Sequence, residues 1–211
     1  MAVEPVSGLD PGRVRANLER VREVAGPDVE ILAATKYVPV DEMEALAEGG
    51  VTLVGENRVQ DLEAKRERLG DAFSWDFIGN LQSRKVKQVL PLVRLVHSLS
   101  SESALDQLGR HGGDETAVLV QVNLSGEESK GGIEPAALAD FIARCPVRVE
   151  GLMTMPPFTE DPERSRPYFA RLAELAAEHG LGRLSMGTSQ DWRVALAEGA
   201  TIVRLGSVLY A

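Results

Sequence analysis

Residues Glu30-Ile-Leu-Ala-Ala-Thr-Lys36 join a short apolar run to a polar side chain, and this pattern recurs along the chain. Short apolar runs favour buried β-strands, whereas the longer stretches between them carry apolar residues at helical spacing. Strands separated by helices run parallel to one another. We expect eight strands, at Glu30–Thr35, Val51–Val54, Ser74–Ile78, Val93–Val96, Ala117–Val122, Val147–Leu152, Arg183–Ser185 and Thr201–Arg204.

The intervening helical patterns complete a series of βα units. Asp10-Pro11 predicts the start of a leading helix, because it pairs an N-cap residue with a proline at the first helical position. Further helices are expected at about Val40–Glu48, Arg58–Leu69, Ser83–Val89, Ser101–Arg110, Pro135–Arg144, Pro162–His179 and Gln190–Glu198. The pattern predicts an α/β fold, a (β/α)8 TIM barrel with an extra N-terminal helix, and an open doubly wound sheet is the alternative. Without a linker or low-complexity tract, residues 1–211 are expected to form one domain.

Composition narrows the class of protein. The 211 residues include 23 Lys and Arg against 32 Asp and Glu, a net charge of −9, which disfavours nucleic acid and anionic lipid as partners. Cys145 is the single cysteine, so no intramolecular disulfide can form. The longest stretch without Asp, Glu, Lys or Arg, Thr116–Gly126, is well short of the about 20 residues of a membrane helix. With no signal-peptide pattern at the N-terminus, we expect a cytoplasmic protein without a metal site.

Polar residues follow the predicted strands, at the end of a parallel barrel where active sites lie. They are Lys36, Gly55-Glu-Asn57, Gly79-Asn80, His97-Ser98, Asn123, Met153-Thr154, Ser185-Met-Gly-Thr-Ser189 and Arg204-Leu-Gly-Ser207. Each has an ordinary structural interpretation, such as a solvated lysine, a packed histidine or an asparagine that caps a helix. Their occurrence together at one mouth of the barrel favours a binding site.

Two of these strand ends indicate a phosphate group. Met186-Gly-Thr-Ser-Gln190 offers a glycine, two hydroxyls and the expected start of a helix, and Gly206-Ser207 adds a further close backbone approach. The first and last strands are neighbours in a closed barrel, so Lys36 and Arg204 would face the same space. A lysine in a partly apolar pocket forms Schiff bases with aldehydes. An aldehyde that carries a phosphate suggests pyridoxal 5′-phosphate, with its ring nitrogen accepting from the donor-only guanidinium of Arg204.

Longer motifs strengthen this interpretation. They are Ala33-Ala-Thr-Lys36-Tyr-Val-Pro, Gly55-Glu-Asn-Arg-Val-Gln-Asp61, Phe77-Ile-Gly-Asn-Leu-Gln-Ser83, Val96-His-Ser98, Gln121-Val-Asn-Leu-Ser-Gly-Glu-Glu-Ser-Lys-Gly131, Gly151-Leu-Met-Thr-Met155, Leu184-Ser-Met-Gly-Thr-Ser-Gln-Asp191 and Val203-Arg-Leu-Gly-Ser207. In these motifs, which span nearly the whole chain in order, the sequence resembles the pyridoxal phosphate homeostasis proteins, relatives of the barrel domain of bacterial alanine racemase.

The resemblance implies roles for particular residues. Lys36 would hold pyridoxal 5′-phosphate as a Schiff base, and Arg204 would face the pyridine nitrogen. The phosphate would be held by Ser189, Gly206 and Ser207, and the surroundings of the ring would be lined by Asn57, His97 and Ser98. Lys130 is a candidate second contact for the cofactor, with surface solvation as the alternative. Two departures from the family pattern, Asp76 in place of histidine and Asn80 in place of histidine or proline, would affect the rim of the site.

Three functions share this site. The resemblance implies a non-catalytic carrier that binds pyridoxal 5′-phosphate in vitamin B6 and amino-acid homeostasis, with cofactor-dependent apoenzymes as partners. The absence of a domain that could be swapped between copies favours a monomer. A small amino-acid racemase is the alternative, although it needs a second proton donor, and Tyr37 would point away from Lys36 if both lay on a strand. A Schiff-base aldolase acting on a sugar phosphate would leave Arg204 without a role. We therefore favour the carrier.

Overall fold

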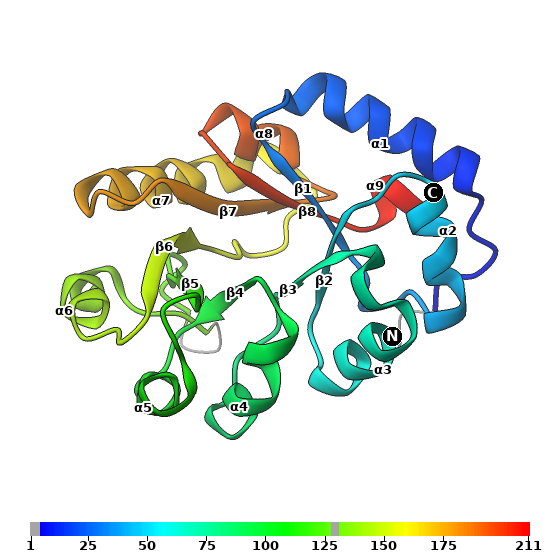
Figure 1. Cartoon of the computed structure of the whole chain (residues 1–211). Coiled ribbons are helices and arrows are strands. Elements are labelled where there is room, and N and C mark those ends of the chain that lie inside the picture. Colours follow the sequence, from blue (N-terminus) through cyan, green and yellow to red (C-terminus); the bar gives the residue numbers. More distant parts are fainter. Residues whose placement is uncertain (1–4, 128–130) are drawn as a thin grey trace.

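The protein folds into a closed barrel of eight parallel strands, in a computed structural model that describes residues 5–127 and 131–211 (Figure 1). The strands are β1 (Glu30–Ala34), β2 (Leu53–Glu56), β3 (Ser74–Phe77), β4 (Leu95–Leu99), β5 (Ala117–Gln121), β6 (Arg148–Met153), β7 (Arg183–Thr188) and β8 (Ile202–Leu205). They follow one another around the barrel in sequence order, and β8 pairs with β1. The predicted TIM barrel is confirmed, and the open sheet is excluded.

Helices surround the barrel (Figure 1). They are α1 (Pro11–Ala25), α2 (Met43–Glu48), α3 (Val59–Leu69), α4 (Val86–Val89), α5 (Glu102–His111), α6 (Leu138–Ala143), α7 (Arg166–Glu178), α8 (Trp192–Ala197) and α9 (Ser207–Tyr210). Several predicted helices open with a turn of 3-10 helix, as at Val40–Glu42 and Pro162–Ser165. None of the helices in residues 5–127 and 131–211 has the length and apolarity needed to cross a membrane.

The N-terminal helix α1 packs against α2 and α9 on the outside of the barrel. It begins as predicted, since the Asp10 carboxylate accepts the backbone N–H of Arg13 at 2.6 Å and Pro11 occupies the first turn. The side-chain amide of Asn17 donates to the carbonyls of Leu209 (3.1 Å) and Ala211 (2.8 Å) in the last turn of the chain. These hydrogen bonds join the N-terminal helix to the last turn of the chain, where α1 lies beside α2 and α9 (Figure 1).

Because side chains alternate between the two faces of each strand, the buried apolar residues form two separate clusters. On β8, Val203 and Leu205 pack outward against the helices, in the larger apolar cluster. Ile202 points inward with Leu32 of β1 and packs in a smaller cluster that fills the barrel. Arg204 lies on the same inward face of β8 and pairs in register with Leu32. The strand pattern thus places a guanidinium inside the barrel, above an apolar layer.

The end of β7 differs from the prediction. The strand continues through Met186 to Thr188, and the helix expected to open at Met186–Gln190 begins only at Trp192. Gly187 explains the difference, because its φ of 89° carries β7 through a shift in register against β8 between Ser185 and Thr188, and a Cβ there would lie 2.6 Å from Ala195 of α8. Helix α8 packs directly on this glycine, so the polar run that follows β7 is a turn.

Candidate functional site

Arg204 lies buried at the centre of the barrel mouth. Its guanidinium donates to the hydroxyl of Ser185 (2.6 Å) and the carbonyl of Thr154 (3.0 Å), and lies 2.8 Å from the sulfur of Met155. All three partners are neutral, so no carboxylate touches this cation in the described residues. Burial lowers the pKa of Arg204 to about 10, while the carboxylate of Asp191 acts in the opposite direction. The mouth of the barrel therefore contains a buried positive charge without a counter-ion in contact.

A line of polar side chains continues from Arg204 into the barrel. His97 Nδ1 lies 2.8 Å from Ser185 Oγ, and His97 Nε2 lies 3.0 Å from Asp76 Oδ2. Burial lowers the pKa of His97, against the opposing effect of Asp76. Burial also opposes ionisation of Asp76, but hydrogen bonds from His97 and Arg94 outweigh it and lower the pKa of this carboxyl. The carboxylate is thus held ionised beside a neutral imidazole.

Arg94 completes this line at the opposite end of the barrel. Its Nε and Nη2 donate to the two oxygens of Asp76 at 3.1 and 2.8 Å, and its Nη1 and Nη2 donate to Glu30 at 2.6 and 2.9 Å. Glu30 opens β1, and it also accepts a hydrogen bond from Arg183 at the start of β7. Polar contacts therefore run through the barrel from the amino ends of the strands to Arg204.

The ends of β7 and β8 meet at Ser189. Its hydroxyl oxygen accepts the backbone N–H of Gly206 at 2.9 Å and that of Val208 at 3.4 Å. Ser207 is exposed at the start of α9, next to Gly206. Three of the residues predicted to hold a phosphate are thus brought to one corner of the mouth. Because Ser189 accepts two amides, its hydroxyl proton is left to donate to another group.

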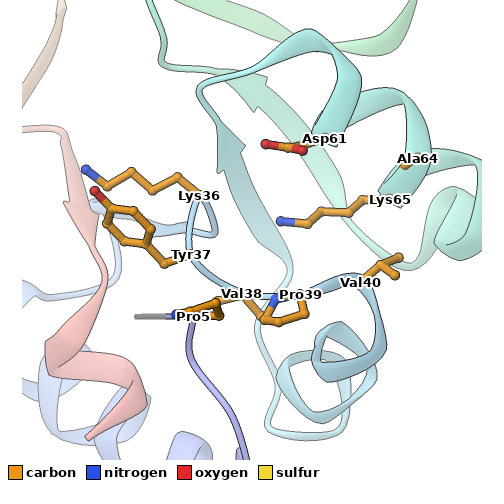
Figure 2. Close-up of a pocket in the computed structure, with 9 residues that line it drawn as sticks. All are labelled: Pro5, Lys36, Tyr37, Val38, Pro39, Val40, Asp61, Ala64 and Lys65. Atoms are coloured by element: carbon orange, nitrogen blue, oxygen red, sulfur yellow. The ribbon is translucent and has the colours of Figure 1, made fainter. Parts of the chain in front are cut away.

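Lys36 lies in the turn that follows β1 rather than on the strand, and its side chain is exposed. Tyr37 was expected to point away from Lys36 if both lay on a strand, but β1 ends at Ala34 and both residues lie in the turn, where side chains do not alternate. The Lys36 ammonium lies 4.8 Å from the centre of the Tyr37 ring, and both side chains extend away from Asp61 and Lys65 (Figure 2). These four residues line an open cavity of about 350 Å³ together with Pro5, Val38, Pro39, Val40 and Ala64.

The turn with Lys36 adjoins the corner formed by Gly206. Tyr210 of α9 donates its hydroxyl to the carbonyl of Ala34 at 3.0 Å, and a Cβ added at Gly206 would lie 3.8 Å from that carbonyl oxygen. Lys36 therefore lies two residues beyond Ala34, whose carbonyl lies next to Tyr210 and Gly206. No hydrogen bond or ion pair joins the Lys36 ammonium to another side chain within residues 5–127 and 131–211.

Asn57 lies where β2, β3 and β4 end. Its Oδ1 is buried and has no hydrogen-bond partner in the described part of the chain. Gly79 packs against it so closely that an added Cβ would lie 2.1 Å from the Asn57 carbonyl oxygen. Ser98 of β4 in turn donates its hydroxyl to the Gly79 carbonyl. A buried acceptor without a donor is costly, so this atom fits a ligand with a donor group.

His97 and Ser98 have hydrogen-bond partners within the protein. Both side chains are also buried, so neither presents a free group at the mouth. Lys130 falls outside the described residues. Asp76 was expected to affect the rim of the site, but it is fully buried inside the barrel, as an acid within the apolar strand Ser74–Phe77 signals. Ser185 was named among the strand ends without a role as a partner of Arg204. No cluster of three or more His, Cys, Asp or Glu side chains suited to a metal occurs in the described residues.

Comparison with known proteins identifies similar chains. Residues 9–211 match the family described as the alanine racemase N-terminal domain. The pyridoxal phosphate homeostasis protein of Aquifex aeolicus is 40% identical over 215 residues, which cover 94% of each chain. The protein of the same name from Pseudomonas aeruginosa is 35% identical and covers 94% of this chain and 92% of its own.

Solved structures agree with these relatives. PipY of Synechococcus elongatus, solved with and without PLP, is 30% identical and covers 94% of this chain and 100% of its own, with TM-scores of 0.82 and 0.83. Alanine racemase of Corynebacterium glutamicum has a TM-score of 0.75 at 15% identity, covering 99% of this chain and 63% of its own. The latter shows a shared barrel fold.

Proposed function

The chain belongs to the family of pyridoxal phosphate homeostasis proteins, within the alanine racemase N-terminal domain family, and we propose on that premise that it binds pyridoxal 5′-phosphate and acts in vitamin B6 and amino-acid homeostasis. The observation that carries the proposal is the buried guanidinium of Arg204, whose contacts are all neutral. Such a cation at the mouth of a barrel attracts an anionic ligand, even though the net charge of the whole chain is −9.

The donors of Arg204 fit an unprotonated pyridine nitrogen. A guanidinium has five N–H groups, and three of them serve Ser185, Thr154 and Met155. One Nη1 N–H and the Nε N–H remain for a ligand. Because a guanidinium stays protonated and only donates, a ring nitrogen that faces it must act as an acceptor.

Lys36 would provide the covalent link. When bound, pyridoxal 5′-phosphate would supply an aldehyde, and Lys36 would hold it through its side-chain amine. The Lys36 side chain is exposed, so an aldehyde can reach its amine from solvent. It lies in the turn beside Gly206, which suits a ligand that spans the amine and the phosphate corner.

The phosphate would bind at the corner of β7 and β8. Ser189 has a hydroxyl proton to donate, and Gly206 and Ser207 allow a close approach to the backbone and add a second hydroxyl. Asn57 would line the ring through its unpaired oxygen. In this proposal His97 and Ser98 act indirectly, His97 through Ser185 and Ser98 through Gly79.

We further propose that the protein holds its cofactor without turning over amino acids. Tyr37, whose ring lies 4.8 Å from the Lys36 ammonium, is the candidate second proton donor, but it is exposed in an open cavity that water can enter. The buried charges nearby, Glu56 and Lys65, are paired with each other. A cytoplasmic, single-domain monomer that passes the cofactor to apoenzymes would fit this role.

The test is the colour of the protein. Addition of pyridoxal 5′-phosphate should produce a visible absorbance band, and borohydride reduction should fix the cofactor on the peptide that contains Lys36, as mass spectrometry would detect. Lys36→Ala should abolish both results, whereas Lys87→Ala, at an exposed position on α4, should leave them unchanged. A colourless wild-type chain contradicts the proposal. Racemisation of alanine that disappears in Lys36→Ala would instead identify a racemase.

A further inference from the structure

We propose that Asp76, His97 and Ser185 form a hydrogen-bond chain of fixed direction that positions Arg204 and keeps its charge available to a ligand. These side chains come from three different strands, β3, β4 and β7, and converge on Arg204 of β8 inside the barrel. All of them are buried. The proposal rests on the proposed function, since the ligand that Arg204 serves is the pyridine ring.

The direction of the chain follows from its two ends. Arg204 can only donate, so Ser185 Oγ is the acceptor of their 2.6 Å contact. Among the described residues His97 Nδ1, 2.8 Å away, is the one acceptor that the hydroxyl proton of Ser185 can reach, so this nitrogen carries the lone pair. The proton of a neutral imidazole therefore resides on Nε2, which donates to Asp76 Oδ2 at 3.0 Å.

The two other protonation states of His97 fit less well. A proton on Nδ1 alone would turn the Nε2 lone pair toward the carboxylate of Asp76, and two acceptors would face each other. An imidazolium would direct Nδ1–H at an oxygen that Arg204 already uses, and the hydroxyl proton of Ser185 would be displaced. The Nε2–H tautomer is the one that gives a partner to both ring nitrogens of His97 and to the hydroxyl proton of Ser185.

The hydrogen-bond chain also keeps the negative charge of Asp76 apart from the positive charge of Arg204. Asp76 is neutralised by Arg94, which donates to both of its oxygens. Between Asp76 and Arg204 stand two neutral groups, the imidazole of His97 and the hydroxyl of Ser185. Arg204 is therefore held in place by side chains that do not cancel its charge. A carboxylate in direct contact would orient the guanidinium equally well, but it would neutralise the positive charge that a ligand meets.

The first test examines the tautomer without any cofactor. The protein has only three histidines, so the His97 signals in long-range ¹H–¹⁵N correlation spectra can be identified as those that disappear in His97→Gln. His97 should show one protonated nitrogen, Nε2, at pH 7. A proton on Nδ1, or an imidazolium at this pH, would overturn the proposal, and this measurement is independent of cofactor binding.

The second test examines how Arg204 meets the ring. Ser185→Ala removes one acceptor of Arg204 and should reduce the preference for pyridoxal 5′-phosphate over its analogue with carbon in place of the ring nitrogen. We expect the ratio of the two affinities to fall about tenfold, which corresponds to the loss of one hydrogen bond to a charged group. Ser185→Thr, which keeps the hydroxyl, should restore the preference.

A matched control separates positioning from stability. Leu175→Ala empties a buried position on α7, outside the barrel, and should destabilise the fold while leaving the ligand preference unchanged. An unchanged preference in Ser185→Ala contradicts the proposal. If the wild-type protein binds neither ligand, the proposed function fails. The role of the Asp76–His97–Ser185 hydrogen-bond chain in ligand binding then fails too, whatever tautomer His97 adopts.

Discussion

Lys65 of α3 donates to the carboxylate of Glu56 at the end of β2 and, at 2.8 Å, to the backbone carbonyl of Thr35. Both charged side chains are buried, and Thr35 donates its own hydroxyl to the same carboxylate oxygen. This cluster joins the turn after β1 to the end of β2. The turn that carries Lys36 is therefore anchored by an ion pair immediately behind it.

Removal of one partner of this pair should be strongly destabilising. We expect Lys65→Met to lower the free energy of unfolding by about 3–5 kcal/mol, because it leaves a buried carboxylate uncompensated. The double variant Glu56→Gln with Lys65→Met should lose less than Lys65→Met alone. Urea denaturation of the three chains measures the difference, with Lys87→Met as the exposed control. A double variant less stable than the single one would show that the pair is not the source of the effect.

Gly79 should tolerate no side chain. In Gly79→Ala the added Cβ would meet the Asn57 carbonyl oxygen at 2.1 Å, so the ends of β2 and β3 must separate. We expect a loss of about 1–3 kcal/mol in unfolding free energy, the cost of an overpacked site, together with weaker cofactor binding. Gly182→Ala is the control, since no atom lies within 4 Å of its added Cβ. Equal stabilities of the two variants would contradict this prediction.

Stability should fall on mild acidification because of His97. Its pKa is lowered from 6.5 by burial, so near that pH the unfolded chain takes up a proton that the folded chain does not. The free energy of unfolding should therefore decrease as the pH falls below about 6.5, by at most about 1.4 kcal/mol per pH unit. Asp76, whose pKa is lowered from 3.8, contributes stability that is lost only at more acidic pH.

Urea denaturation at pH 7.5 and 5.5 checks this dependence. His97→Gln should remove the part of the slope that lies below pH 6.5, whereas the exposed His111→Gln should retain the wild-type slope. If His97→Gln responds to pH as the wild type does, another group is responsible.

Ser189 should distinguish ligands by their phosphate. Ser189→Ala removes the hydroxyl that would donate to the phosphate, and it leaves the amides of Gly206 and Val208 without their acceptor. Affinity for pyridoxal 5′-phosphate should fall about tenfold or more, as for a hydrogen bond to a charged group, while affinity for pyridoxal changes little. Absorbance titration with both ligands provides the measurement. Equal losses for the two would place the phosphate elsewhere.

The fold could be predicted almost completely because its elements alternate so regularly. The eight predicted strands correspond to the eight of the barrel, and the start of α1 is correct because Asp10-Pro11 is a local signal. The errors lie at strand ends. Gly187 continues β7 through a positive φ, and α9 is a single turn of four residues, too short for a periodic pattern. These features depend on tertiary packing rather than on local preference.

The site was predicted only in part, for a similar reason. Ser189, Gly206 and Arg204 could be placed by their positions after strands, and the structure brings them to one mouth. The orientation of Lys36 could not be predicted, because strand alternation ends at Ala34 and the following turn sets the side chain. The partners of His97 come from β3 and β7, which are distant in sequence, so no local motif could connect them.

The contact between α1 and the last turn bears on the folding kinetics of the barrel. Asn17 bonds to carbonyls that are 192 and 194 residues away, so this contact closes a loop of nearly the whole chain. We expect a contact between residues so far apart in sequence to form late in folding. Contacts made after the transition state slow unfolding with little effect on the folding rate. In stopped-flow measurements Asn17→Ala should therefore shorten the time for which the closed barrel persists and leave the rate at which it forms nearly unchanged.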